Sequence, residues 1–213
     1  MPSTKKEVIR MFDAQIIVPI RYSNWISNLV TTRKKTGEIR LCVDFRNLNK
    51  VYLKENYPLG KMDHILQRVV GSSRISLLDG FSGYNQILVQ PEDQAKTAFT
   101  TPWGTFMYLK MPFGLMNAGA TVQRAMDIAF AKEIHDFLVV YQDDITVFSK
   151  SDNEHLNRLR RVFIKCRKFG ISLNPKKTLF GLEEGKLLGN IISKDGIRID
   201  PTRIESILTI SHP

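Results

Sequence analysis

The sequence predicts a mixed α+β fold, and three observations lead to this class. Short runs of apolar and β-branched residues, typical of strands, recur along the whole chain. Segments with helical periodicity lie between them, without the strict alternation that is typical of parallel α/β folds. The composition is that of an ordinary globular protein, since 43% of the 213 residues are hydrophobic and 24% are charged, so a sizeable core is expected.

The expected strands are short and are expected to form antiparallel sheets. Each is rich in apolar or β-branched residues, and several are bounded by Gly, Pro, Asn or Asp. In chain order they cover residues 16–18, 41–45, 75–78, 86–89, 106–109, 137–141, 145–148 and 187–192.

Three helices are expected, and the clearest covers residues 152–169. Gly170 follows it at a position where a glycine commonly ends a helix. A second helix covers 58–70 before Gly71, and a third covers about 118–132. The helix at 152–169 is strongly basic on one face and is predicted to place a set of apolar residues on the other: Leu156, Leu159, Phe163, Cys166 and Phe169.

The charge balance favours a polyanionic partner. There are 31 Lys and Arg against 21 Asp and Glu, which gives a formal net charge of +10. Nucleic acid is the natural candidate, although many basic surfaces are merely exposed to solvent and bind no nucleic acid.

Several other classes of protein are disfavoured. No apolar stretch approaches the length of a membrane span, and the polar N-terminus does not resemble a signal sequence, so an intracellular, soluble protein without a membrane partner is expected. Cys42 and Cys166 are expected to be reduced core residues, and no Cys or His spacing predicts a zinc site. Without internal repeats or linkers, the chain is expected to be one continuous catalytic unit with subdomains.

The most informative segment, residues 137–148, contains two apolar runs that meet at Asp143 and Asp144. It predicts a β-hairpin with both aspartates at its turn, although Asp is common in turns because its side chain hydrogen-bonds the local backbone. Asp79 ends another apolar run, 75–79. Three carboxylates at strand ends could bind a pair of Mg²⁺ ions, which prefer oxygen ligands.

The sequence resembles the reverse transcriptases of gypsy-type retrotransposons with long terminal repeats, which are related to the retroviral enzymes. The resemblance runs from near Lys5 almost to Pro213, and six ordered motifs carry it. They are Leu41-Cys-Val-Asp-Phe-Arg-Asn-Leu-Asn49, Leu77-Leu-Asp-Gly-Phe-Ser-Gly-Tyr-Asn-Gln-Ile87, Met111-Pro-Phe-Gly-Leu-Met-Asn-Ala118, Tyr141-Gln-Asp-Asp144, Leu173-Asn-Pro-Lys-Lys177 and Leu188-Gly-Asn-Ile-Ile-Ser193.

This resemblance implies the fingers and palm of a right-hand polymerase that copies RNA or DNA into DNA. Asp79, Asp143 and Asp144, with the backbone carbonyl of Gly80, would bind two Mg²⁺ ions, with Mn²⁺ as an alternative. Lys177 would protonate the leaving pyrophosphate, with Lys176 as the competing choice.

The resemblance also implies substrate contacts. Tyr84 would be the steric gate that selects deoxynucleotides, or else an aromatic packed against the palm. Gln123 would face the template or lie on the surface as an ordinary polar residue. A basic fingertip that contacts the triphosphate is implied at Arg33, Lys34, Lys35 and Arg40. A loop that lines the nucleotide pocket is implied at Phe113 and Gly114. A hairpin that grips the primer is implied at Leu188, Gly189 and Asn190.

The resemblance predicts a division in which about 1–60 and 90–115 form fingers and the remainder forms palm with the start of a thumb. An RNase H segment is expected to be absent. The implied partners are a primed RNA or DNA template, dNTPs, and other polyprotein segments such as RNase H and integrase, in the cytoplasm or in a virus-like particle.

Three positions depart from the family pattern: Gln142 precedes the paired aspartates, Gly119 replaces a usual Pro and Val122 replaces a usual Phe. Two alternatives to an active polymerase stay open. One is a catalytically weak or inactive nucleic-acid-binding fragment, which the complete set of carboxylates disfavours. The other is a structural subunit that partners an active polymerase.

Overall fold

The computed structural model describes residues 2–33, 39–81 and 83–209. The chain forms two compact units that interleave in sequence. Unit 1 comprises Met1–Tyr57 and Ser82–Val122, and unit 2 comprises Pro58–Phe81 and Gln123–Pro213. How these units correspond to fingers and palm stays a prediction.

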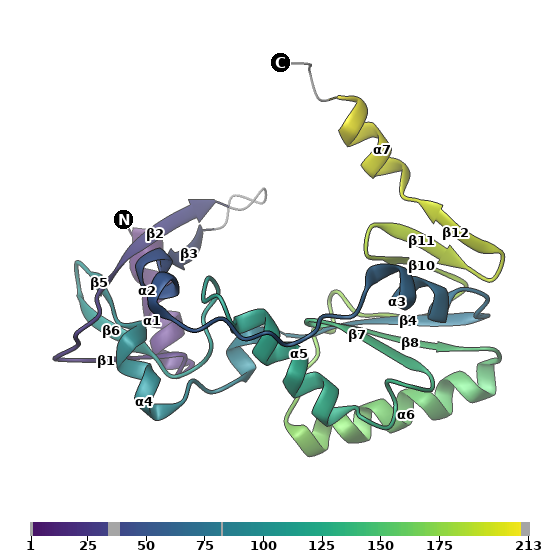
Figure 1. Ribbon diagram of the computed structural model, residues 1–213, viewed down its shortest axis with the longest axis horizontal. Coiled ribbons are helices and arrows are strands. Elements are labelled where there is room, and N and C mark those ends of the chain that lie inside the picture. Colours follow the sequence, from purple (N-terminus) through teal and green to yellow (C-terminus); the bar gives the residue numbers. More distant parts are fainter. Residues whose placement is uncertain (1, 34–38, 82, 210–213) are drawn as a thin grey trace. The chain divides into compact units, whose positions relative to one another are not determined.

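Unit 1 is built on a five-stranded sheet with the order β1-β6-β5-β2-β3 (Figure 1). All neighbouring strands are antiparallel except β2 and β5, which are parallel. The strands are β1 (Ile17–Pro19), β2 (Ser27–Arg33), β3 (Ile39–Val43), β5 (Phe99–Thr101) and β6 (Gly104–Tyr108).

The helices of unit 1 are mostly short. A buried cluster unites the sheet with α1 and α2 through Val8, Ile17, Phe45, Leu48 and Phe99. The helical elements are α1 (Pro2–Asp13), α2 (Arg46–Val51), α4 (Pro91–Gln94), the 3₁₀ turns Gly83–Gln86 and Ala95–Thr97, and the start of α5 (Ala118–Ala129).

Unit 2 contains a four-stranded antiparallel sheet with the order β7-β8-β4-β9 and a three-stranded sheet with the order β10-β11-β12. The strands are β4 (Arg74–Asp79), β7 (Leu138–Tyr141), β8 (Asp144–Ser149), β9 (Leu179–Leu182), β10 (Glu184–Leu187), β11 (Asn190–Ser193) and β12 (Gly196–Ile199); the helices are the rest of α5, α3 (Met62–Val69), α6 (Asp152–Phe169) and α7 (Pro201–Leu208).

Helices cover both faces of the four-stranded sheet. On one face, Ile65, Leu66 and Val69 of α3 join a cluster with Ile75 and Phe148 of the sheet. On the other face lies α6, which contacts β8 and β4 (Figure 1). Because successive side chains of a strand point to opposite faces, each residue of β4 and β8 belongs to one of these two environments.

Helix α6 has the predicted bounds, and its ends have clear causes. Ser151 accepts a hydrogen bond from the backbone N–H of Glu154, and Glu154 Oε2 accepts one from the N–H of Lys150, 3.1 Å away. Gly170 ends the helix with φ of +66°, a conformation that glycine adopts without a steric penalty.

The predicted apolar face of α6 is only partly buried. The buried residues of the helix are His155, Leu159, Val162 and Cys166. Of the other residues predicted on the apolar face, Leu156 is 67% exposed, Phe163 36% and Phe169 44%. The sequence predicted a face of large apolar residues, whereas the face that packs on the sheet includes a polar histidine.

The remaining secondary-structure predictions have mixed outcomes. Of the residues predicted as a strand at 86–89, Gln86 is the last residue of a 3₁₀ turn, and only Leu88 forms an isolated bridge, to Lys110. The strand predicted at 187–192 is interrupted by the turn between β10 and β11. Cys166 is buried, Cys42 is partly buried, and both are free thiols. Among the described residues, no helix is long and apolar enough to cross a membrane.

Candidate active site

The paired aspartates lie at the turn of the β7–β8 hairpin. Tyr141 pairs with Asp144, so only Gln142 and Asp143 form the loop, and Asp144 is the first residue of β8. A two-residue hairpin loop requires positive φ at its first position, and Gln142 has φ of +58°. The predicted hairpin is confirmed, with Asp144 displaced from the turn into the strand.

Asp79 joins the other carboxylates through the pairing of β4 with β8. Asp79 is the direct cross-strand partner of Asp144, so both side chains leave the sheet on the same face. The N–H of Gly80 donates to the Asp143 carbonyl oxygen over 3.0 Å. A Cβ at Gly80 would lie 3.1 Å from that oxygen, which explains why the chain approaches the turn at a glycine.

A loop that follows α6 supplies two donors to Asp79. Lys177 Nζ lies 3.3 Å from Asp79 Oδ1, and Asn174 Nδ2 lies 3.2 Å from Oδ2. The backbone N–H of Asn174 also donates to the Asp79 carbonyl oxygen. The sequence motif predicts a role for Lys177, whereas the role of Asn174, which belongs to the same motif, was not predicted.

The three carboxylates produce an excess of negative charge. Burial raises the pKa of Asp144, the charges of Asp143 and Asp79 raise it further, and Lys177 opposes the shift. A group whose charged form is disfavoured by its neighbours is typical of sites that bind a cation or perform chemistry.

The residue types predicted here fit a hard cation such as Mg²⁺, because carboxylate and carbonyl oxygens are the ligands that it prefers. In the described part of the chain, however, no three carboxylate, imidazole or thiolate groups are arranged so that they could hold a metal ion. The Asp79 carboxylate is engaged by Lys177 and Asn174 instead. In this structure Asp79 therefore forms an ion pair with Lys177, and metal binding by the three carboxylates stays a prediction.

Gln123 of α5 forms hydrogen bonds to the β7–β8 hairpin. It is buried, at 4% exposure, so it neither faces a template nor lies on the surface, and both predictions for it are wrong. Its Oε1 accepts the N–H of Gln142 over 2.8 Å, and its Nε2 donates to Asp127 and to the Val140 carbonyl oxygen. The turn that carries Asp143 is therefore fixed by a side chain of α5. Sequence periodicity could not reveal this, because an interior polar residue looks like a surface one until its partner is known.

In unit 1 the structure brings together Tyr84 and Phe113, which the sequence analysis assigned separately to the sugar and the nucleotide pocket. Their ring centroids lie 4.5 Å apart. The adjacent Gly114 has φ of +97°, and its carbonyl oxygen accepts a hydrogen bond from Asn49, whose Oδ1 also accepts the N–H of Met116. Asn49 thus fixes this loop, a role that was not predicted.

The predicted fingertip lies mainly outside the described residues. Lys34 and Lys35 are not described, and Arg33 and Arg40 are placed by their backbones alone, at the ends of β2 and β3. Arg40 pairs with Thr32 and Arg33 with Ile39, so β2 and β3 form an antiparallel pair.

The predicted primer grip is a tight turn between β10 and β11. Leu188 and Gly189 form its loop, with φ of +49° and +78°. Asn190 begins β11, and its side-chain amide donates to the Leu188 carbonyl oxygen. A Cβ at Gly189 would lie 2.7 Å from the guanidinium of Arg203, so the glycine permits both the turn and this close approach.

Comparisons with known proteins find relatives of this chain. Residues 32–192 match the family model "Reverse transcriptase (RNA-dependent DNA polymerase)". The chain is 34% identical, over 195 residues, to the retrovirus-related Pol polyprotein from transposon 297 of Drosophila melanogaster, covering 92% of this chain and 18% of that protein. It is also 34% identical, over 213 residues, to the Pol polyprotein from transposon gypsy of the same organism, covering 97% of this chain and 20% of that one. The chain therefore spans about a fifth of these relatives.

Among solved structures, a foamy viral protease-reverse transcriptase in complex with double-stranded DNA matches the entire chain. The TM-score is 0.91 at 22% sequence identity, and the match covers 37% of that protein. This likeness confirms the predicted α+β fold of polymerase fingers and palm.

Proposed function

The chain belongs to the reverse transcriptase family, and on that premise we propose that it catalyses RNA- and DNA-templated DNA synthesis with Asp79, Asp143 and Asp144 as its catalytic carboxylates. The observation that carries the proposal is the direct pairing of Asp79 with Asp144 beside the turn that holds Asp143. A charged cluster of this kind, fixed at the ends of neighbouring strands, favours a function over a purely structural role.

The proposed cofactor is a pair of Mg²⁺ ions, with Mn²⁺ as an alternative, held by these carboxylates and the Gly80 carbonyl oxygen. Bound there, the ions would lower the pKa of the primer 3′-hydroxyl and neutralise charge on the triphosphate and on the departing pyrophosphate. The oxygen-only donor set and the raised pKa of Asp144 support this choice.

The protein's own contribution is positioning. Asn174 orients Asp79 through its backbone and its side chain, and Gln123 fixes the turn of Asp143. Lys177, paired with Asp79 and 68% exposed at its side chain, is close enough to the carboxylates to donate a proton to pyrophosphate.

The substrate roles are proposed residue by residue. Tyr84, supported by Phe113 and Gly114, would contact the sugar of the incoming dNTP and reject a 2′-hydroxyl. The turn at Leu188, Gly189 and Asn190 would hold the primer end by its backbone. The triphosphate would be met by the basic residues of the β2–β3 hairpin, namely Arg33, Lys34, Lys35 and Arg40.

The proposed fingers are about 1–60 and 90–115, most of which belongs to unit 1, and the remainder is the proposed palm with α7 as the start of a thumb. The proposed partners are a primed RNA or DNA template and, because the relatives are polyproteins, other segments such as RNase H and integrase. The same relatives support a location in the cytoplasm or in a virus-like particle.

Extension of a labelled DNA primer on an RNA template, with dNTPs and Mg²⁺ at low salt, tests the proposal. Asp143→Asn should abolish extension while the thermal unfolding curve stays that of the parent chain. The matched control is Asp195→Asn, an exposed aspartate of the same unit, which should extend normally. If neither the parent nor the variant extends a primer that it demonstrably binds, the chain is a nucleic-acid-binding module and the catalytic proposal is wrong.

A further inference from the structure

The two flanks of α6 differ in how their cations are used. On one flank, the cations pair with carboxylates of the chain: Arg158 with Glu154 at 2.6 Å, and Arg161 and Lys165 with the buried Glu133 at 3.3 and 3.5 Å. The guanidiniums of Arg158 and Arg161 also lie over the Phe137 ring. This flank attaches the helix to the segment before β7.

The other flank carries an exposed mixture of cations and apolar side chains. Arg160 and Arg167 are exposed and, within the described residues, neither forms an ion pair. Phe163 lies between them in sequence and contacts Phe180 of β9, with ring centroids 6.2 Å apart in an edge-on arrangement. We call this surface the α6 strip: Leu156, Arg160, Phe163, Ile164, Arg167 and Phe180.

The α6 strip is too apolar for an ordinary solvated helix face. Leu156 is 67% exposed, Ile164 59% and Phe180 54%. From Leu156 to Arg167 the strip extends about 17 Å along the helix. Contiguous exposed apolar surface of this kind marks binding sites.

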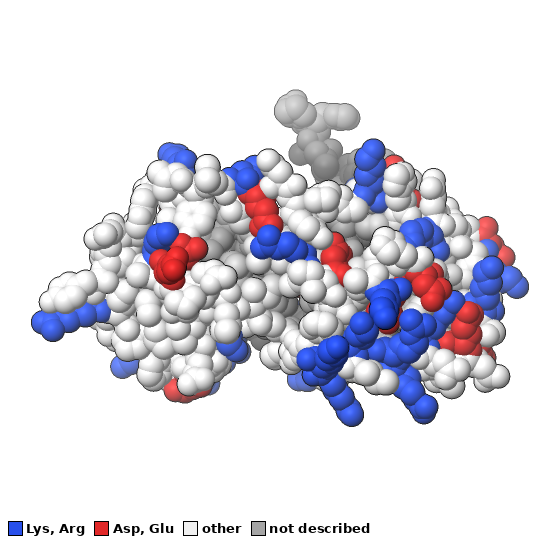
Figure 2. Space-filling view, turned by 60° about the horizontal axis from the view of Figure 1, so that its bottom comes forward, with Lys and Arg blue, Asp and Glu red and all other residues white. Residues whose placement is uncertain are grey.

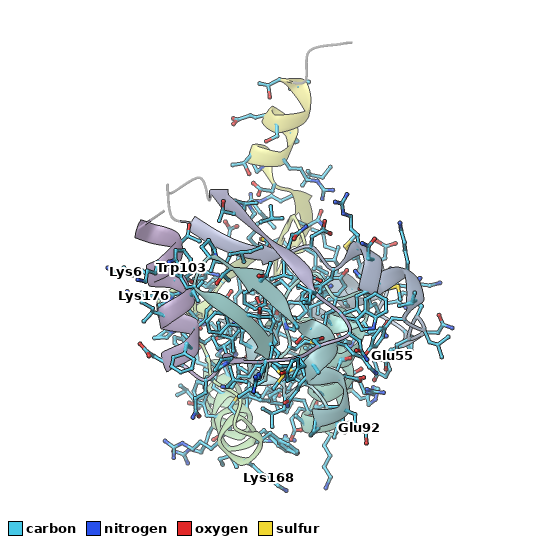
Figure 3. The ribbon with its side chains drawn as sticks, turned by 90° about the vertical axis from the view of Figure 1, so that its left-hand side faces the viewer. Lys6, Glu55, Glu92, Trp103, Lys168 and Lys176 are labelled. Atoms are coloured by element: carbon cyan, nitrogen blue, oxygen red, sulfur yellow. The ribbon has the colours of Figure 1, made fainter. Side chains whose placement is uncertain are left out.

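The charge around the strip identifies the class of partner. Residues 155–182 contain eight Lys and Arg and no Asp or Glu. Lys and Arg gather on the surface over α6 in Figure 2. At the end of the helix, Lys168 extends outward in Figure 3, with its ammonium 5.6 Å from the centroid of the Phe169 ring. Four of these eight cations pair with carboxylates outside this span, and the other four, Arg160, Arg167, Lys168 and Lys176, form no ion pair within the described residues. Unpaired cations of this kind attract a polyanion.

The strip lies on the opposite side of the sheet from the carboxylates. Ser76 of β4 and Ser149 of β8 contact His155 of α6. Asp79 and Asp144 differ from these residues by an odd number of positions along their strands, so their side chains point to the other face. A duplex held at the carboxylates therefore does not explain the strip.

We propose that the α6 strip is a second nucleic-acid site, which binds single-stranded RNA or DNA. Arg160 and Arg167, about 11 Å apart along the helix axis, would contact phosphates on either side of a base that stacks on Phe163 or Phe180. Exposed aromatic rings between unpaired cations are the combination that binds single strands without sequence preference, because every base has a face that can stack. The proposal does not depend on polymerase activity.

The test uses a fluorescein-labelled single-stranded oligothymidylate and a labelled DNA hairpin, with binding measured by fluorescence anisotropy in EDTA. Arg160→Gln/Arg167→Gln removes the unpaired cations, and Phe163→Leu/Phe180→Leu keeps apolar groups but removes the rings. Lys5→Gln/Lys6→Gln, at two exposed lysines of α1, is the charge-matched control. Thermal unfolding is recorded for every variant, so that affinities are compared only between folded chains.

The arginine variant should bind the oligothymidylate more weakly, and the slope of log affinity against log salt should become shallower by about 1.4, which corresponds to two lost phosphate contacts on a single strand. The leucine variant should bind it about fivefold or more weakly, with the hairpin unaffected, because only unpaired bases can stack on the rings. Primer extension on the hairpin should be unchanged in both variants.

Oligothymidylate affinities equal to those of the lysine control, in both strip variants, would overturn the proposal. A leucine variant that loses affinity for the hairpin as much as for the oligothymidylate would also overturn it, since the rings would then not recognise single strands. Finally, a polyglutamate peptide is tested as a competitor. If it binds in a manner that requires the strip while the oligothymidylate does not, the partner is an acidic protein and the proposal is wrong.

Discussion

Strand β4 carries two polar clusters on opposite faces, and they differ in how their hydrogen-bonding groups are satisfied. In the interior, Ser76 Oγ lies 2.7 Å from His155 Nε2, and Ser149 Oγ lies 2.9 Å from Nδ1. At the end of the strand, Asp79 and its neighbours bring together carboxylates whose charges repel one another. The first cluster is neutral and complete, whereas the second is charged and only partly compensated.

In the interior cluster, every hydrogen bond can be assigned a donor and an acceptor. Ser149 donates to the Ser151 carbonyl oxygen, so its Oγ must accept the Nδ1–H of His155. His155 Nε2 is then the acceptor for Ser76, whose Oγ also accepts the N–H of Gly181. A network in which every hydrogen-bonding group has a partner stabilises a fold. Carboxylates that repel one another do not, so their presence points to a function. This difference separates structural polar groups from functional ones.

The largest expected effect belongs to Asp144→Asn. Removing this charge should lower primer extension by about a thousandfold or more. At the same time it should leave the free energy of unfolding unchanged or raise it by about 0.5 kcal/mol, because the repulsion from Asp143 and Asp79 is relieved and solvent screens most of it. Single-turnover extension and urea unfolding measure the two quantities. Clear destabilisation would mean that the carboxylates support the fold, and the contrast between the clusters would disappear.

Gln123→Ala tests whether the charged cluster depends on a buried support. The change removes the Gln123 oxygen that accepts the N–H of Gln142 and should lower the free energy of unfolding by about 1–3 kcal/mol. Extension per folded molecule should fall by about tenfold, because the turn of Asp143 is no longer held. If the parent and the alanine variant are equally active after correction for the folded fraction, the turn of Asp143 keeps its position without Gln123.

Ser76→Ala provides the corresponding test of the interior cluster. It leaves His155 Nε2 and the Gly181 N–H without the hydroxyl that pairs them, and should cost about 1–2 kcal/mol of unfolding free energy. Extension per folded molecule should not change. A variant as stable as its parent would show that water replaces the hydroxyl, and a fall in activity alone would give the interior cluster a role in catalysis.

The sequence predicted the parts of this molecule that depend on local pattern. The bounds of α6 follow from Ser151, its apolar period and Gly170, and the β7–β8 hairpin follows from two apolar runs. The resemblance selected Asp79, Asp143 and Asp144, which the structure brings together. These features are encoded within short segments, or in motifs whose order is read directly.

What the sequence did not reveal depends on partners distant along the chain. Burial of His155 in place of Leu156 is decided by the serines of β4 and β8, and burial of Gln123 is decided by the backbone of the β7–β8 turn. Asn174 and Asn49 fix loops through contacts 95 and 65 residues apart. Periodicity does not report such pairings, because a polar residue that is satisfied in the interior follows the same pattern as one on the surface.

The smallest expected effect is a pH dependence of stability that arises from His155. Burial lowers the pKa of His155, the charges of Arg158 and Arg74 lower it further, and Asp152 opposes the shift. The unfolded chain therefore binds the proton more readily than the folded one, so this contribution to stability is complete above the unfolded value of 6.5 and is lost as the pH falls below it. The measurement compares the parent chain with His155→Gln. Their difference in unfolding free energy should shrink between about pH 6.5 and pH 5, since the other pH-dependent groups are common to both chains. Aspartates such as Asp152, whose pKa is lowered from 3.8, act only at lower pH. A difference that is constant over this interval would mean that the serines accommodate a charged imidazole, and the interior cluster would then resemble the charged one more closely than its hydrogen bonds indicate.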